Sequence, residues 1–137
     1  MKIYLASRFG NRKVLQEVRD TLNAVNNYEV VSRWIDVEDR PEGKAEENFW
    51  GNWSKIDIED LDVCDCLILY TEGCIKDPPR GGMRFEEGYV YAQKKPVVVV
   101  GPRLIIFDQL EDKFYCRDWQ ECYKVLKALN WNKTKGD

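Results

Sequence analysis

Apolar residues along the chain follow two patterns: short, nearly continuous apolar runs, and longer segments in which apolar residues recur at helical spacing. The short runs predict strands at residues 2–6, 29–32, 65–70 and 97–100. The helical spacing predicts helices at about residues 11–25, 45–63, 83–94 and 118–129. Alternating strands and helices are typical of a mainly parallel sheet covered by helices. We therefore predict one α/β domain over residues 1–137, flavodoxin- or Rossmann-like, with about five strands and helices on both faces.

The connecting segments show where a ligand would bind. Open α/β sheets bind ligands beyond the C-terminal ends of their strands. This rule selects residues 6–12, 33–36, 71–82 and 101–103 as candidate site loops. The charged loop through Asp36, Asp39, Pro41 and Gly43 offers little apolar surface to bury, and we expect it to be mobile. We expect a flexible tail at residues 130–137.

Size and charge narrow the class of protein. A chain of 137 residues with 44% hydrophobic content suits one compact domain. Its 21 Lys plus Arg nearly balance 24 Asp plus Glu, so no charge bias favours a nucleic-acid polymer or a membrane surface. No apolar run approaches the roughly 20 residues that span a bilayer. We expect a cytosolic protein with a small-molecule ligand.

The five cysteines and the absence of histidine limit the available chemistry. An odd number of cysteines without a signal sequence argues against a disulfide framework and favours reduced, buried thiols. A zinc site would need several of these cysteines together, and we expect neither a metal nor a cofactor. Without histidine, acid–base chemistry must come from carboxylates, tyrosine, lysine or a thiol.

The segment 80–89, Arg-Gly-Gly-Met-Arg-Phe-Glu-Glu-Gly-Tyr, is the most informative in the sequence. Paired glycines let the backbone approach a ligand, and the following helix N-terminus presents free amide donors. We expect Glu86 in the first helical turn on the face of Met83 and Val90, with Glu87 pointing elsewhere. Glu86 is then either a partner of the helix dipole or a reactive carboxylate.

Asp57 supplies a second carboxylate on an apolar helical stripe. A buried carboxylate must be hydrogen-bonded, paired or protonated, because its isolated ionised form costs several kcal/mol. A structural role would be a helix cap or a salt bridge to Arg33, Arg80 or Arg84. The functional alternative is an acid of raised pKa that protonates a leaving base while Glu86 stays ionised and attacks, as in retaining glycosyl transfer.

Three groups of residues together resemble the nucleoside 2-deoxyribosyltransferase superfamily. They are residues 3–9 (Ile-Tyr-Leu-Ala-Ser-Arg-Phe), Asp57 ahead of Asp65 and its apolar strand, and Gly82 with residues 86–89 followed by Ala92 and Lys95-Pro96. The resemblance covers about residues 2–100. The superfamily includes deoxyribosyltransferases and N-glycosidases of nucleoside 5′-monophosphates.

The resemblance implies a role for each matching residue. Glu86 would attack the anomeric carbon and form a glycosyl-enzyme intermediate. Asp57 would contact and protonate the base, and Tyr4 would orient the nucleophile near the sugar, although Tyr4 also suits a plain core position. We assign Asp65 to structure. The resemblance also implies at least a homodimer, in which a neighbouring subunit completes the site.

One departure from the family pattern bears on the substrate. Six residues before the nucleophile, the transferases have an aspartate that helps to hold the base, and the nucleotide hydrolases have a small polar residue that contacts the 5′-phosphate. Arg80 occupies this position. An arginine beside two glycines at a helix N-terminus suits a phosphate, so we favour a nucleotide over a nucleoside.

Further residues complete the predicted substrate-binding set. Ser7 and Arg8 would be additional phosphate contacts, although a solvated loop role is as plausible for both. Phe9 and Gly82 belong to the matching motifs. Trp34 follows the second strand and would stack on the base, whereas we expect Trp50 and Trp53 to serve helix packing or subunit contacts. The competing hypothesis of a non-catalytic nucleotide-binding module is weakened by two carboxylates that would face an anionic ligand.

Overall fold

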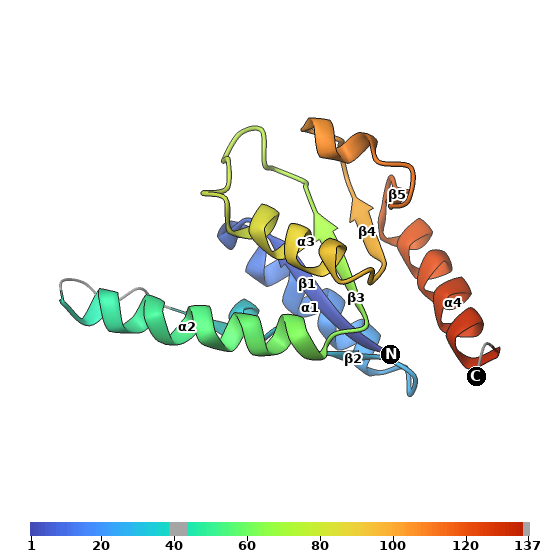
Figure 1. Cartoon of the computed structure of the whole chain (residues 1–137), viewed down its shortest axis with the longest axis horizontal. Helices are drawn as coiled ribbons and strands as arrows, with labels where there is room; N and C mark the ends of the chain where they lie inside the picture. The colour runs from blue at the N-terminus through green and yellow to red at the C-terminus, as the bar shows by residue number, and fades with distance from the viewer. Residues whose placement is uncertain (39–43, 136–137) are drawn as a thin grey trace.

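A five-stranded, all-parallel sheet forms the centre of the protein (Figure 1). The computed structural model describes residues 1–38 and 44–135. The sheet order is β2-β1-β3-β4-β5, the flavodoxin-like order. The strands are β1 (Lys2–Ser7), β2 (Glu29–Val30), β3 (Cys66–Tyr70), β4 (Val97–Val100) and β5 (Phe114–Cys116). The α/β fold predicted from the alternating pattern is confirmed.

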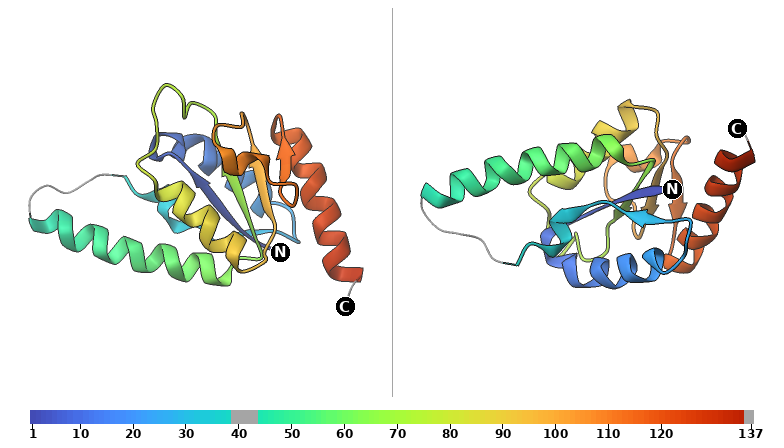
Figure 2. Two further views of the ribbon diagram at one scale, coloured as in Figure 1. Left: turned by 45° about the horizontal axis from the view of Figure 1, so that its top comes forward. Right: turned by 90° about the horizontal axis from the view of Figure 1, so that it is seen from below.

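Helices cover both faces of this sheet (Figure 2). They are α1 (Arg12–Asn23), α2 (Lys44–Val63), α3 (Gly82–Ala92) and α4 (Trp119–Lys135). Helices α2 and α3 pack together on one face, and α1 and α4 lie on the other. The N-terminal half of α2 projects beyond the sheet (Figures 1 and 2). No described helix is both long and apolar enough to cross a membrane.

The core explains why the central strands lack polar positions. Strands β3 and β4 lie between two helical layers, so residues 66–69 and 97–100 are all buried. Every cysteine is free and buried, which confirms the prediction of reduced core thiols. Asp65 accepts a hydrogen bond from the Lys2 amide at 2.7 Å and thereby joins the starts of β1 and β3, a structural role as predicted.

Several local predictions were wrong. Val14 and Val25, which we placed on the buried face of the first helix, are 38% and 46% exposed. Residues 33–36 form a short 3-10 helix, η2, in which Trp34 and Ile35 are buried against the core. Its Asp36 pairs with Arg19 at 2.6 Å, so this part of the charged loop is anchored. Residues 39–43, with Asp39, Pro41 and Gly43, lie outside the described residues.

The C-terminal third also differs from expectation. Helix α4 continues past residue 129 to Lys135, so residues 130–135, predicted as part of a flexible tail, are helical. Residues 136–137 lie outside the described part of the chain. The sequence pattern did not locate β5, because the strand has three residues and only Cys116 is fully buried.

A buried ion network joins the segment 102–113 to α3. Arg84 makes two hydrogen bonds to Asp108, at 2.8 and 3.0 Å, and one to Glu87 at 3.1 Å. The ammonium group of Lys113 reaches Glu87 at 2.6 Å and the Phe107 carbonyl oxygen at 2.8 Å. Glu87 was expected to point away from Met83 and Val90, but all three are buried on the same side of α3.

This network predicts a large cost for removing Lys113. The substitution Lys113→Met leaves Glu87 buried with half of its compensating charge, and should lower the free energy of unfolding by about 3 kcal/mol in urea titration. The double variant Lys113→Met/Glu87→Leu removes both charges and should recover most of this loss. A double variant less stable than Lys113→Met would show that Glu87 does not depend on Lys113.

Candidate active site

A cavity lies beyond the C-terminal ends of β1 and β3. Its volume is about 760 Å³, within the range of small-molecule sites. Its wall includes eight of the nine residues predicted to act on the substrate: Ser7, Arg8, Phe9, Trp34, Asp57, Arg80, Gly82 and Glu86. The ninth, Tyr4, is fully buried in β1 and interacts with Glu86. The structure therefore brings the predicted residues together, and their roles remain predictions.

Glu86 reaches the cavity from the second turn of α3. The helix begins at Gly82, so Glu86 lies beyond the first turn in which we had placed it, where the helix dipole would act most strongly. Its side chain leans back toward the helix start, as helical side chains do, and a Cβ atom at Gly82 would lie 3.8 Å from Glu86 Oε1. Gly81 precedes the helix with φ 104°, a conformation that favours glycine.

The environment of Glu86 favours its protonated form. Oε2 is buried and has no hydrogen-bond partner among the described residues. Burial raises the pKa of Glu86 to about 8, against a lowering by the Tyr4 hydroxyl and with a further increase from Asp57. A buried carboxylate with a purely structural role normally has a cation or an amide donor as its partner, as Glu87 has.

Asp57 is the second carboxyl group at the cavity. It projects from α2, and its Oδ1 is buried without a hydrogen-bond partner in the described chain. The salt bridges considered for it are not formed, since Arg33 binds Asp60 and Glu59 while Arg84 binds Glu87 and Asp108. Burial raises the pKa of Asp57 to about 6; Asp60 adds to this and Arg33 opposes it.

Tyr4 lies beneath this pair. Its hydroxyl forms no well-aligned hydrogen bond within the described residues, yet it is close enough to Glu86 for each group to alter the other's pKa. Burial, Glu86 and Asp57 together raise the pKa of Tyr4, so its proton is retained and faces the carboxylates. The neutral hydroxyl of Tyr4 lowers the pKa of Glu86 and so favours the ionised form of that carboxyl group.

The order of the two carboxyl pKa values is opposite to our expectation. We predicted that Asp57 holds the proton and Glu86 stays ionised, but without substrate the pKa of Glu86 is the higher. The physical reason is that Glu86 is deeply buried. Desolvation raises its pKa by more than the Tyr4 hydroxyl lowers it. Such a coupled pair is best described as sharing one proton between about pH 6 and 8.

The polar side chains at the end of β1 and just after it form hydrogen bonds within the fold. The Ser7 hydroxyl donates to the Tyr70 carbonyl oxygen at 2.6 Å and accepts from the Asn11 side chain at 2.8 Å. Asn11 also donates to the Glu72 carbonyl oxygen at 2.9 Å. The Ser7 proton is therefore already used between β1 and β3, and the expected hydrogen bond from this hydroxyl to a phosphate is not available in this arrangement.

Aromatic rings form another side of the cavity. Trp34 stacks on Phe9 with ring centroids 6.5 Å apart, and its Nε1 donates to the Leu5 carbonyl oxygen at 2.7 Å. Trp50 and Trp53, for which we expected only packing or subunit contacts, also line the cavity. The side chain of Trp50 is 40% exposed, so a planar ligand has more accessible ring surface on α2 than on Trp34, which is 8% exposed.

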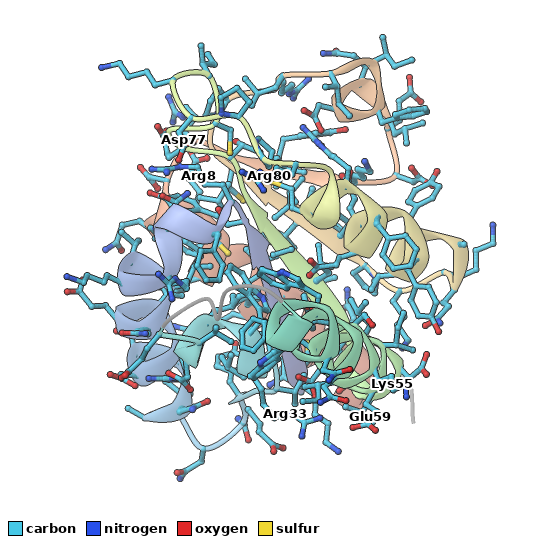
Figure 3. All side chains as sticks on the ribbon, turned by 90° about the vertical axis from the view of Figure 1, so that its left-hand side faces the viewer. Arg8, Arg33, Lys55, Glu59, Asp77 and Arg80 are labelled. Carbon is cyan, nitrogen blue, oxygen red and sulfur yellow. The ribbon has the colours of Figure 1, made fainter. Side chains whose placement is uncertain are left out.

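Arginines provide the cationic side of the cavity. Figure 3 shows Arg8 and Arg80 grouped with Asp77, away from Arg33, Lys55 and Glu59. Arg80 is exposed and has no ion pair within the described residues, whereas Arg8 pairs with Asp77 at 2.7 Å. The sequence did not single out Asp77 as a site residue, because an acidic residue followed by two prolines is typical of an ordinary loop. Only the rule for strand ends, which selected residues 71–82, included it.

Comparisons with known proteins give a fold but no close relative. No protein-family model matches the chain, and no curated protein matches it in sequence. The solved CMP N-glycosidase BcmB of Clostridium botulinum matches with a TM-score of 0.61 and 15% identity, over 93% of this chain and 99% of that one. A 2-deoxyribosyltransferase from Bacillus psychrosaccharolyticus matches with a TM-score of 0.63 and 23% identity, over 89% and 90% of the two chains. The chain has the fold of these enzymes, as the resemblance implied.

The raised pKa of Glu86 predicts that this residue costs stability when it ionises. An unfolded Glu ionises near pH 4.5, so the native state retains the extra proton and stability falls from pH 4.5 to about 8. Glu86→Gln mimics the protonated form. It should match the wild type near pH 4 and exceed its free energy of unfolding by about 2–4 kcal/mol at pH 9.

Glu111→Gln, at an exposed glutamate, is the matched control and should show no such growing difference. Urea unfolding at several pH values measures both variants. A gain for Glu86→Gln that is equal at pH 4 and pH 9 would mean that the benefit does not come from removing a buried charge.

Proposed function

We propose that the protein is an N-glycosidase that hydrolyses the base–sugar bond of a nucleoside 5′-monophosphate. The observation that carries this proposal is the pair Asp57–Glu86, two carboxyl groups with raised pKa values and unpartnered oxygens at one cavity. Groups with perturbed pKa values in a cavity of ligand size are the usual sign of acid–base or nucleophilic chemistry. The fold shared with a CMP N-glycosidase and a 2-deoxyribosyltransferase supports the same reaction class.

The first chemical step uses both carboxyl groups. The Glu86 carboxylate attacks the anomeric carbon as the bond to the base breaks, and the proton of the pair passes through Asp57 to the departing base. This step requires one proton on the pair, the state it holds between about pH 6 and 8. The Tyr4 hydroxyl favours Glu86 in its ionised form, and positive charge developing on the sugar acts in the same direction.

The second step releases the sugar. A water molecule gives its proton to the Asp57 carboxylate and attacks the anomeric carbon, which breaks the ester to Glu86 and restores the one-proton state. The products are a free base and a sugar 5-phosphate. The cationic side of the cavity at Arg8 and Arg80 supports a phosphorylated substrate, and the rings of Trp50 and Trp53 offer a stacking surface for the base.

Base release from a substrate panel tests this function. The protein is incubated with ribo- and deoxyribonucleotides and with the corresponding nucleosides, each with and without a free acceptor base. We expect release of base from a monophosphate, with at least a 10³-fold loss of kcat in Glu86→Ala and a glycosyl adduct on Glu86 detected by mass spectrometry.

The same panel separates the alternatives. Exchange of bases that depends on an acceptor would identify a deoxyribosyltransferase, the activity named for one of the structural matches. Binding without base release or exchange would indicate a nucleotide-binding module. Unchanged activity in Glu86→Ala would contradict the assignment of the nucleophile.

The coupled carboxyl pair predicts a bell-shaped pH profile. The profile of kcat/KM, which reflects the free enzyme, should have limbs near pH 6 and 8, because activity requires one proton on the pair. The Tyr4 hydroxyl lowers the pKa of Glu86, so Tyr4→Phe should move the upper limb to higher pH and lower kcat. Tyr28→Phe, at the opposite end of the sheet, should leave both limbs in place. A fixed upper limb in Tyr4→Phe would remove Tyr4 from its proposed role.

A further inference from the structure

The space that the Arg8 guanidinium occupies depends on two neighbouring glycines. A Cβ atom on Gly10 would lie 2.3 Å from Arg8 Nη1, and one on Gly73 would lie 2.8 Å from Nη2 and 2.9 Å from Nε. Gly73 also has φ 76°, where other residues are strained. Two glycines therefore make room for the guanidinium on both sides.

Asp77 is the ionic partner of Arg8 and the more exposed member of the pair. Arg8 Nη1 contacts Asp77 Oδ2 at 2.7 Å, and the two side chains are 22% and 70% exposed. Asp77 has no other hydrogen bond to its carboxylate within the described residues, and Arg8 Nε is buried without a partner there. An exposed ion pair of this kind contributes about 0–1 kcal/mol, so a competing anion can replace the carboxylate at little cost.

The competing anion would bind where the substrate lies. Asp77, Arg8 and Arg80, which lie together in Figure 3, line the same cavity as Glu86. A phosphate group offers Arg8 more charge and more acceptor oxygens than one carboxylate, and can use the unpartnered Nε as well. An uncharged sugar hydroxyl cannot compete with Asp77 for the guanidinium.

We propose that Asp77 is a displaceable internal anion that occupies the phosphate position at Arg8 until a phosphorylated ligand replaces it. Asp77 is thereby a specificity-determining residue: it weakens the binding of every phosphorylated ligand by the strength of its own ion pair, and it leaves the affinity for unphosphorylated sugars unchanged. The inference rests on the nucleotide substrate of the proposed function. It adds an acidic residue that acts against substrate binding.

Calorimetric binding at low ionic strength tests this role without requiring turnover. The probes are inorganic phosphate and ribose 5-phosphate, with ribose as the unphosphorylated reference. Asp77→Asn keeps the shape of the side chain and removes its charge. We expect it to bind both phosphate compounds about twofold to fivefold more tightly than the wild type, with ribose binding unchanged.

Two controls identify the mechanism. Asp20→Asn removes a carboxylate of similar exposure that pairs with Arg19 outside the cavity, and it should change no affinity. In the background of Arg8→Gln, which lacks the guanidinium, removing the Asp77 charge should no longer tighten binding of the phosphate compounds. An equal gain in both backgrounds would mean that Asp77 acts through general repulsion, and would overturn the proposal.

Other outcomes separate this inference from the proposed function. Equal or weaker phosphate binding by Asp77→Asn overturns the displaceable anion even if the protein hydrolyses nucleotides. No detectable phosphate binding by either protein also overturns it. Tighter binding by Asp77→Asn without any base release from nucleotides would support the anion and refute the glycosidase.

Discussion

The order of the strands determines where this protein can have a site. The chain leaves β1 toward β2 on one side and leaves β3 toward β4 on the other, so the connections after these adjacent strands diverge and leave a crevice. Both sides of the cavity derive from this divergence. Arg8 follows β1, whereas Asp77 and Arg80 follow β3. Bonds from Ser7 and Asn11 to the end of β3 hold the two strand ends together below the crevice.

In and around that crevice, some of the described carboxylates have a cationic partner and others have none. Arg84 and Lys113 neutralise Glu87 and Asp108, Arg33 binds Asp60, and Arg8 binds Asp77. Among the described carboxyl groups that line the cavity, only Asp57 and Glu86 have buried oxygens without a hydrogen-bond partner. Burial raises the pKa of both. This arrangement costs stability, because one of two neighbouring acids must keep a proton near neutral pH. Such a cost is common where a protein has chemistry to perform.

Sequence patterns predicted the architecture and eight residues that line the cavity, but not the electrostatics of that cavity. Hydrophobic spacing located β1, β3, β4 and all four helices because these elements bury continuous apolar surface. It did not locate β5. It also placed η2 in a mobile charged loop, although Trp34 and Ile35 of this segment are buried against the core. The motifs brought Glu86 and Asp57 to one cavity, yet the order of their pKa values depends on depth and on Tyr4, which no pattern along the chain encodes. Asp77 became visible only through its contact with Arg8.

Glu86 and Glu87 are consecutive glutamates, but the fold places them in different environments. Glu87 lies between two cations on the buried side of α3, whereas Glu86 lines the cavity and forms no ion pair within the described residues. At 15–23% identity to proteins of the same fold, an alignment can slip by one position here at almost no penalty in its score. Such a slip would exchange the carboxylate of a buried ion network for the carboxyl group at the cavity. Remote relatives of this chain are therefore better compared by the neighbours of each carboxylate in space than by matching glutamates in a row.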